Sequence, residues 1–389
     1  MNSVSKKNKY EIDMCNGSIM DKLISFSLPL MLSGILQLMF NAVDIVVVGR
    51  FSGSQALAAV GSTSALINMF TNLFIGVSLG ANVLAARFYA SGRSKEMSET
   101  VHTSITFALI SGIVMVFVGL FFSRFALELM ATPSDVIDQA ALYMKIYFLG
   151  MPFFMLYNYG AAILRAVGDT KRPLFFLIAA GLINAGLNMI LVIVFHMGVA
   201  GVAIATVISQ FVSCVLVLRC LYQSDSSYQL RFSKLTLKKN HLKQIFQVGI
   251  PAGIQSTVIN FSNVLLQSSV NSFGSIAMAG YTAANNIFGF LFVAVNSVTQ
   301  ACMSFTSQNF GVGKWKRMDK VLWNCIILSV VVADLYKRSA GYSMWSGDFT
   351  LHHSYLFPVW SDGFISRSFT WNGTFSSAYV FICNRNSGD

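Results

Sequence analysis

Long apolar runs without a charged residue dominate the chain. Five stretches lack Asp, Glu, Lys and Arg altogether: 23–43, 51–86, 100–123, 173–218 and 244–313. A helix needs about 20 apolar residues to cross the roughly 30 Å hydrocarbon core of a bilayer, so each stretch can span it at least once. The runs do not alternate apolar and polar residues as barrel strands do, which predicts helices.

Interruptions inside the longest runs set the number of spans. The run 173–218 is interrupted by His-Met-Gly at 196–198, and the last run by Asn-Ser-Phe-Gly at 271–274. Each of these two runs is therefore predicted to hold two helices. A further span, 139–164, contains a single lysine. We predict an all-α polytopic membrane protein with eight spans and the start of a ninth.

Basic residues mark one side of these spans. The chain carries a net charge of +11, but 54% of its residues are hydrophobic and 11% are charged, against about 25% charged in a soluble domain. Twenty Lys and Arg residues precede the first span or follow the second, fourth, sixth and eighth, whereas the other loops hold Arg50 and Arg124. This bias predicts a cytoplasmic N-terminus. It indicates topology and not a nucleic-acid partner.

Motifs of soluble chemistry do not occur in the sequence. The five histidines form no HExxH, and no GxSxG is present. Gly311-Val-Gly-Lys314 lacks the spacing of a phosphate-binding loop. The six cysteines show no metal-ligand spacing and mostly lie in apolar runs, which predicts reduced packing residues. We expect no enzyme activity, no cofactor and no metal.

An internal repeat organises the spans. At a shift of 221 residues, Gly53, Ser54, Ala56 and Ala58 match Gly274, Ser275, Ala277 and Ala279. One residue out of that register, Pro29 faces Pro251. Because six spans separate the copies, both cross the membrane in the same direction. Parallel repeats of this kind are typical of secondary transporters, whose substrate cavity lies between or within the halves.

The repeat and the loops predict the domains. We assign a cytoplasmic N-terminal segment to 1–22, a six-helix N-lobe to 23–221, a cytoplasmic interlobe loop to 222–244, a partial C-lobe to 245–333 and an atypical tail to 334–389. The tail is polar, and three of the five tryptophans lie in it. We interpret this abrupt change as a truncation or frameshift after about residue 333 that leaves the C-lobe incomplete.

Several short motifs occur in order along residues 20–330. They are Phe26-Ser-Leu-Pro29, Asn41-Ala-Val-Asp44, Val48-Gly-Arg-Phe51, Ala56-Leu-Ala-Ala-Val-Gly61, Leu164-Arg-Ala-Val-Gly-Asp-Thr-Lys-Arg-Pro173, Gly198-Val-Ala-Gly-Val-Ala-Ile-Ala-Thr206 and Gln308-Asn-Phe-Gly311. Together they resemble the multidrug and toxic compound extrusion (MATE) transporters, particularly the bacterial branches. The resemblance implies a two-lobe helical bundle in the bacterial inner membrane. It also implies antiport of small cationic organic compounds against H⁺ or Na⁺, by a monomer that contacts membrane lipids.

Asp44 is the one carboxylate inside the apolar body of the chain. A charge near the bilayer centre costs roughly 2.5 to 3.5 kcal/mol, so such a residue normally faces a cavity and carries ions, protons or substrate. Asn41 lies three residues earlier on the same helix face and is expected to hydrogen-bond the acid. The alternative is a helix-end residue that reaches the outer interface near Arg50.

The resemblance assigns roles to further residues of the N-lobe. It implies that Asp44 is the cation-coupling carboxylate and that Tyr143, Asn184 and Thr206 belong to a polar network around it. Many members have a second acid where this chain has Asn188. The single acid favours coupling to one proton over a sodium site with two carboxylates.

Two other residues have alternative interpretations. Proline lacks the helical N–H donor and bends a helix, and the resemblance suggests that Pro29 is a hinge. Lys145 can extend its long side chain to the outer interface, or it can act as a counter-charge to Asp44.

Three functions remain open on the sequence. The first is a drug antiporter in which protonation of Asp44 from outside releases a bound cation. The second is a lipid-linked saccharide flippase of the same superfamily. The third is a truncated membrane protein without transport.

Overall fold

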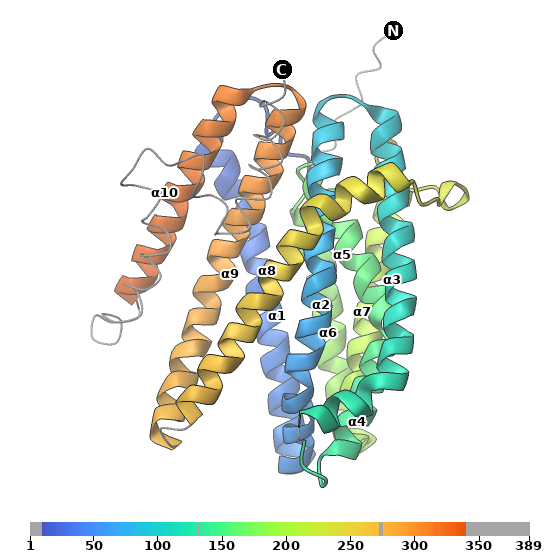
Figure 1. The fold of residues 1–389 in the computed structure, drawn as a ribbon, viewed down its shortest axis with the longest axis vertical. Coiled ribbons are helices and arrows are strands. Elements are labelled where there is room, and N and C mark those ends of the chain that lie inside the picture. The colour runs from blue at the N-terminus through green and yellow to red at the C-terminus, as the bar shows by residue number, and fades with distance from the viewer. Residues whose placement is uncertain (1–9, 131, 272–274, 340–389) are drawn as a thin grey trace.

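The chain folds into long helices joined by short turns in the computed structural model, which describes residues 10–130, 132–271 and 275–339 (Figure 1). The helices are α1 (Ile19–Phe51), α2 (Gly53–Ala90), α3 (Ser94–Leu129), α4 (Ile137–Leu149), α5 (Met151–Ala166), α6 (Lys171–Asn188), the π-helix η1 (Met189–Val194), α7 (Gly198–Tyr222), the short 3₁₀ helix η2 (Phe232–Lys234), α8 (Lys239–Asn271), α9 (Ser275–Gly311) and α10 (Trp315–Ser339). Within these ranges there is no strand. The all-α fold class is confirmed.

Six helical segments within the described ranges are long and apolar enough to cross a membrane. They are α1, α2, α3, α6 with η1, α7 and the second part of α9, and the bent pair α4 and α5 makes a seventh. The helices coincide in position with the eight predicted spans and the start of the ninth. However, α8 and α10 do not meet the same apolar criterion over the part of each helix whose side chains the structure describes. Polar residues such as Gln247 and Gln255 lower the apolar character of α8.

The break points of the bundle follow glycine and proline. The predicted span over 139–164 coincides with the pair α4 and α5, between which the chain bends by 48° at Gly150. Pro152 then lies in the first turn of α5. A backbone N–H at that position has no acceptor within the helix, so the absence of an N–H in proline removes no helical hydrogen bond. The predicted break at 196–198 is confirmed: His196 has a φ of 52° and Gly198 a φ of 55°.

The two lobes meet at a glycine-rich contact between α2 and α8. Gly76 and Gly80 of α2 lie against Gly249 and Gly253 of α8 so closely that a Cβ on Gly80 would come within 2.1 Å of the Ile245 carbonyl oxygen. Small residues at this spacing allow two membrane helices to approach closely. In the repeat, α1 corresponds to α8 and α2 corresponds to α9. The counterpart of the contact between α2 and α8 is therefore a contact between α9 and α1. Both pairs are in contact.

A second hydrophobic cluster joins α1 to the C-lobe. Leu23, Phe26 and Leu30 of α1 are buried with Phe305 of α9 and Val321 of α10. The Phe26 and Phe305 rings meet edge to face at 5.7 Å. The main cluster lies mostly in the N-lobe, with residues of α2, α3, α4, α5 and α7, and also includes Ile245 of α8. The first turns of α1 therefore pack with the second lobe, although the sequence divides the lobes at the interlobe loop.

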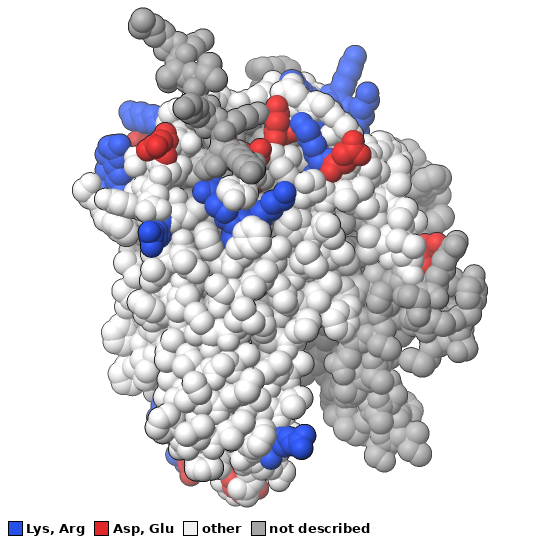
Figure 2. Space-filling view, turned by 180° about the vertical axis from the view of Figure 1, so that it is seen from behind, with Lys and Arg blue, Asp and Glu red and all other residues white. Residues whose placement is uncertain are grey.

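We call the end of the bundle that carries the segment 10–18 and the turns 91–93, 167–170, 223–238 and 312–314 the basic end. Figure 2 shows many Lys and Arg side chains in a band near this end of the face in view. Towards the opposite end, α8 and α9 lean away from α1 and α2 in Figure 1.

Three predicted boundaries differ from the ends of the helices in the structure. The interlobe loop is shorter than 222–244, because α8 already begins at Lys239. Similarly, α1 begins at Ile19, so that the last residues of the predicted segment 1–22 are helical. Helix α10 continues to Ser339, past the predicted start of the tail. The rest of the tail, and with it the interpretation of a frameshift, lies outside the described residues.

Candidate functional site

Asp44 lies on α1, two turns before the end of that helix, and is half-buried. Its carboxylate Oδ1 accepts a hydrogen bond from Nδ2 of Asn188, the last residue of α6. These two residues are 144 positions apart and meet because α1 packs beside α6. The structure therefore brings together the predicted acid and the predicted amide of Asn188.

A chain of side-chain bonds continues from Asn188 into α7. Asn188 Nδ2 also donates to Asn184 Oδ1 at 3.2 Å, and Asn184 Nδ2 donates to the Thr206 hydroxyl at 3.5 Å. The Thr206 hydroxyl in turn donates to the Val202 carbonyl at 3.0 Å. We call Asp44, Asn184, Asn188 and Thr206 the Asp44 cluster. Asn188 Nδ2 is the donor to the carboxylate, and the remaining bonds donate away from Asp44 towards the Val202 carbonyl.

Asn188 has one polar atom without a partner. Its side chain is fully buried, and its Oδ1 accepts no hydrogen bond within the described structure. A buried unsatisfied acceptor costs free energy and calls for an explanation, such as a functional role. The π-helix η1 begins at the next residue, Met189. Such segments occur often at functional sites, and the sequence analysis did not predict this one.

Tyr143 lies on α4, buried beside Tyr147 one turn later. Their ring centroids are 6.2 Å apart, and both phenols lie within electrostatic range of Asp44. Tyr143 was predicted from the sequence as a site residue, whereas Tyr147 was not. The spacing of four residues, which places both rings on one helix face, was the available signal.

Other predicted residues lie apart from the cluster. Asn41 is exposed, and the hydrogen bond to Asp44 in the described part of the chain comes from Asn188 and not from Asn41. The reason is that the C-terminal end of α6 approaches Asp44 from across the helix interface. Lys145 is also exposed. Pro29 is buried inside a continuous α1, and its carbonyl accepts a bond from the Ser33 hydroxyl at 2.8 Å.

A second polar region lies at the basic end and was missed by the sequence analysis. Glu11 accepts hydrogen bonds from the hydroxyl groups of Tyr89 at 2.8 Å and Tyr228 at 2.7 Å. The Ile12 N–H donates to the Gly168 carbonyl at 3.3 Å. The segment before α1, which the sequence presents only as a polar tail, is thereby fixed to the N-lobe.

The same segment is also bonded to the C-lobe. The Met14 carbonyl accepts from Asn309 Nδ2 at 3.1 Å and from Arg317 Nε at 3.2 Å. Lys314 Nζ donates to the Cys15 carbonyl at 2.9 Å. We call residues 10–18 together with these bonded side chains the seal, because they connect the two lobes at one end of the bundle.

Direct hydrogen bonds between the lobes lie next to the seal, further into the bundle. Gln308 Nε2 of α9 donates to the Ala166 carbonyl at 2.7 Å. The Ser304 hydroxyl donates to Asn82 Oδ1 at 3.0 Å, and Asn82 Nδ2 donates to the Ala162 carbonyl at 2.9 Å. All of these polar groups are buried. The sequence analysis used Gln308 only as part of a motif.

The turn 167–170 supports the seal with a buried ion pair. Asp169 is fully buried and bonds both the backbone N–H and the guanidinium Nε of Arg172. Burial raises the pKa of the Asp169 carboxyl, and the charge of Arg172 opposes this shift. The pair fixes the turn whose Gly168 carbonyl receives the Ile12 N–H.

Metal and disulfide chemistry have no visible basis in the described ranges. No group of three or more His, Cys, Asp or Glu side chains there could hold a metal ion. Cys214, Cys220, Cys302 and Cys325 are thiols.

Comparison with known proteins identifies the class of this fold and site. The chain matches the MatE family model over residues 29–190 and 251–335. It is 31% identical over 325 residues to the "Probable multidrug resistance protein YoeA" of Bacillus subtilis, covering 80% of this chain and 70% of that protein. It is 29% identical to the "Probable multidrug resistance protein YpnP" of the same organism, covering 79% and 68%. The chain thus spans about 70% of the length of these relatives.

Solved structures share the fold at lower sequence identity. One is described as the outward-facing conformation of a multidrug resistance MATE family transporter of the MOP superfamily; it aligns with a TM-score of 0.78 and 21% identity over 90% of this chain and 77% of that one. Another, a MATE crystal structure in the bent conformation, aligns with a TM-score of 0.76 over 89% and 76%.

These findings define a multi-pass membrane transporter and not an enzyme. The chain belongs to the MatE family.

Proposed function

We propose that this protein exports small cationic organic compounds in exchange for protons. The relatives that it matches are named as multidrug resistance proteins, which supports this class of substrate. The observation that carries the proposal is the pairing of a lone carboxylate, Asp44, with the neutral amide of Asn188.

The chemistry of the Asp44 cluster favours a proton as the coupling ion. A sodium site with two acids needs a second carboxylate, and this cluster offers amides and one hydroxyl instead. In its ionised form Asp44 attracts an organic cation, while Asn188 holds the carboxylate in place. A proton that arrives from the opposite end neutralises the acid and removes this attraction, so that the cation leaves.

Aromatic side chains near the acid suit the same substrates. Tyr143 and Tyr147 lie within electrostatic range of Asp44, and aromatic faces attract organic cations. Such contacts are tolerant of shape, as expected of a binding site for varied compounds.

The transport cycle then requires the seal to open. With the seal closed and the lobes leaning apart at the opposite end, the structure corresponds to a release state (Figure 1). We assign the basic end to the cytoplasm of a bacterium and the bundle to the inner membrane, because positive charge favours the cytoplasmic side. A monomer contains one complete Asp44 cluster and suffices for this cycle.

The test uses purified protein in liposomes with ethidium as the transported cation. A pH gradient alone should drive ethidium transport, whereas a Na⁺ gradient alone should not. Asp44→Asn should reduce pH-driven transport to the level of empty liposomes. Full transport by Asp44→Asn, or a wild type driven by Na⁺ alone, would exclude proton coupling at Asp44.

A further inference from the structure

A groove lies along the first half of α8, outside the Asp44 cluster and the seal. It has a volume of about 510 Å³. Its lining consists of Lys239 and Lys243 at one end and, along the rest, four apolar residues and one polar residue: Leu242, Phe246, Ile250, Pro251 and Gln247. These residues recur every three or four positions and therefore share one face of the helix. We propose that this α8 groove binds an anionic phospholipid of the leaflet at the basic end.

The groove has a polar end and an apolar end at the separation that a lipid requires. Lys239 is the first residue of α8, beside the basic turn 223–238, and Pro251 lies twelve residues further into the span. At a rise of 1.5 Å per residue this distance is about 18 Å. Half of a hydrocarbon core is about 15 Å thick, so a headgroup at the lysines places its acyl chain along the apolar end.

The two lysines are available for a negatively charged headgroup. Both side chains belong to exposed residues, and neither forms an ion pair or a side-chain hydrogen bond in the described part of the chain. The two acids of α3 that lie near His241 of α8 already have partners: Glu96 pairs with Arg93 at 2.7 Å, and Glu99 lies 3.7 Å from His241.

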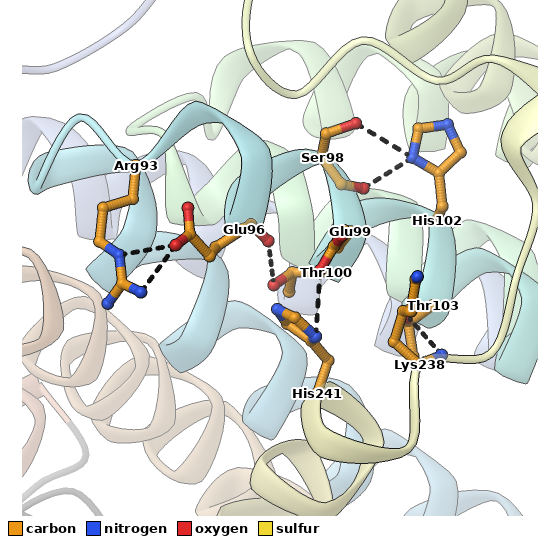
Figure 3. A network of polar contacts seen from close by, with 9 residues as sticks. All are labelled: Arg93, Glu96, Ser98, Glu99, Thr100, His102, Thr103, Lys238 and His241. Atoms are coloured by element: carbon orange, nitrogen blue, oxygen red, sulfur yellow. Dashed lines mark hydrogen bonds and ion pairs between the residues drawn. The ribbon is translucent and has the colours of Figure 1, made fainter.

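Contacts with α3 hold the start of α8 in place without a lipid (Figure 3). The Lys238 N–H donates to the Thr103 hydroxyl at 3.3 Å, and the Arg231 N–H donates to His102 Nε2 at 3.0 Å. Deeper in the groove, the Phe246 ring meets Phe107 of α3 edge to face at 5.1 Å. These contacts fix the groove-lining part of α8 against α3 before any lipid binds.

The charge and the surroundings identify one kind of occupant. Two lysines repel the cationic compounds of the proposed transport, and the mainly apolar remainder of the groove does not favour a soluble anion. Helix α8 crosses the front of the bundle, where it faces outward (Figure 1). Basic pockets on transmembrane helices near the cytoplasmic side commonly bind anionic headgroups. An anionic phospholipid satisfies both ends of the groove.

The test measures lipid binding by the full chain in detergent, by native mass spectrometry and thermal unfolding. The probes are phosphatidylglycerol, phosphatidylcholine with the same acyl chains, phosphatidylglycerol with six-carbon chains, and inorganic phosphate. Long-chain phosphatidylglycerol should bind and raise the unfolding midpoint. The other three should bind at least tenfold more weakly.

The double variant Lys239→Gln/Lys243→Gln should weaken phosphatidylglycerol binding roughly thirtyfold, since a lysine near a membrane surface contributes about fivefold. The matched control is Lys316→Gln/Lys320→Gln, which removes two exposed lysines at the same spacing on α10. This control should bind as the wild type does. Equal losses in both double variants, or equal binding of phosphatidylcholine, would overturn the proposal. These readouts need no transport, so they stand apart from the test of proton coupling.

Discussion

The seal and the Asp44 cluster are both networks of hydrogen bonds, but they are built differently. In the seal, backbone carbonyl groups such as those of Met14 and Cys15 receive several donors from different helices. In the Asp44 cluster, side chains form a single line from Asp44 through Asn188 and Asn184 to Thr206. The seal is redundant, and the cluster is not.

This difference indicates which changes affect stability and which affect function. A redundant network tolerates the loss of one bond, because other bonds hold the same segment. The Asp44 cluster has only one path of hydrogen bonds to its single carboxylate, so the loss of any one bond changes the surroundings of Asp44. Substitutions near Asp44 should therefore alter the coupling ion or the rate, whereas substitutions at the lobe interface should alter the opening or stability of the bundle.

The largest expected effect is a change of coupling ion by Asn188→Asp. A second carboxylate beside Asp44 makes it unfavourable for both acids to be charged, so that the pair shares a proton or binds a hard cation. Transport driven by a pH gradient should fall about tenfold, equivalent to about 1.4 kcal/mol, and Na⁺ should stimulate it. The measurement is ethidium transport in liposomes under each gradient.

The control for this change is Asn240→Asp, the same substitution at an exposed position near the start of α8, at the basic end. It should keep the proton as the coupling ion. A matching switch to Na⁺ in both variants would show that general charge, and not the bond to Asp44, sets the ion.

The next largest effect concerns the glycine contact between the lobes. In Gly80→Ala the added Cβ would meet the Ile245 carbonyl oxygen at 2.1 Å, and overpacking of this kind costs about 1 to 3 kcal/mol. Thermal unfolding in detergent should show a lower midpoint. Gly61→Ala on the same helix is the control, since a Cβ there meets nothing within 4 Å. Equal midpoints for the two variants would refute the close contact.

A smaller effect is expected from Glu11→Gln in the seal. The neutral amide oxygen replaces a charged acceptor for Tyr89 and Tyr228, and a hydrogen bond to a charged group is worth about 1.5 to 3 kcal/mol. The remaining bonds of residues 10–18 should keep the protein folded. Hydrogen–deuterium exchange of this segment should rise about tenfold, which corresponds to about 1.4 kcal/mol.

Glu128→Gln provides the matched control, because that carboxylate is in an exposed pair with Arg124 towards the opposite end. Exposed pairs contribute about 0 to 1 kcal/mol, so exchange of residues 10–18 should stay at the wild-type rate. Unchanged exchange in Glu11→Gln as well would mean that Glu11 does not hold the seal.

The smallest effect should come from Thr206→Val at the far end of the Asp44 cluster. The change removes the hydroxyl that links Asn184 to the Val202 carbonyl. Such bonds between membrane helices average about 0.6 kcal/mol, so the transport rate should fall by less than about threefold. A loss as complete as that of Asp44→Asn would place Thr206 in the ion site itself.

Much of the fold follows from the sequence because a bilayer imposes few solutions. Uncharged runs and basic loops predicted the helices, and the break at 196–198 coincides with two positive φ angles. The bend at Gly150 was not predicted. The run 139–164 is interrupted only by Lys145, and its length alone indicates one uninterrupted helix. The position of Pro152 two residues after Gly150 was the signal available.

The candidate site was predicted in part. The spacing of Asn184 and Asn188 correctly indicated one helix face, and they are bonded to each other. The partner of Asp44 could not be chosen between Asn41 and Asn188 from local spacing, because it depends on how α6 crosses α1. The seal escaped prediction for the same reason. Its carbonyl acceptors are present in every residue and carry no sequence signal.

The most direct test of the central claim is the affinity for tetraphenylphosphonium as a function of pH. This probe keeps its charge at every pH, so only the protein can titrate. If a proton and the cation compete for Asp44, the wild-type affinity should weaken by up to tenfold for each unit that the pH falls, a change of about 1.4 kcal/mol. The affinity of Asp44→Asn should not vary with pH. A pH dependence in Asp44→Asn equal to that of the wild type would contradict the account.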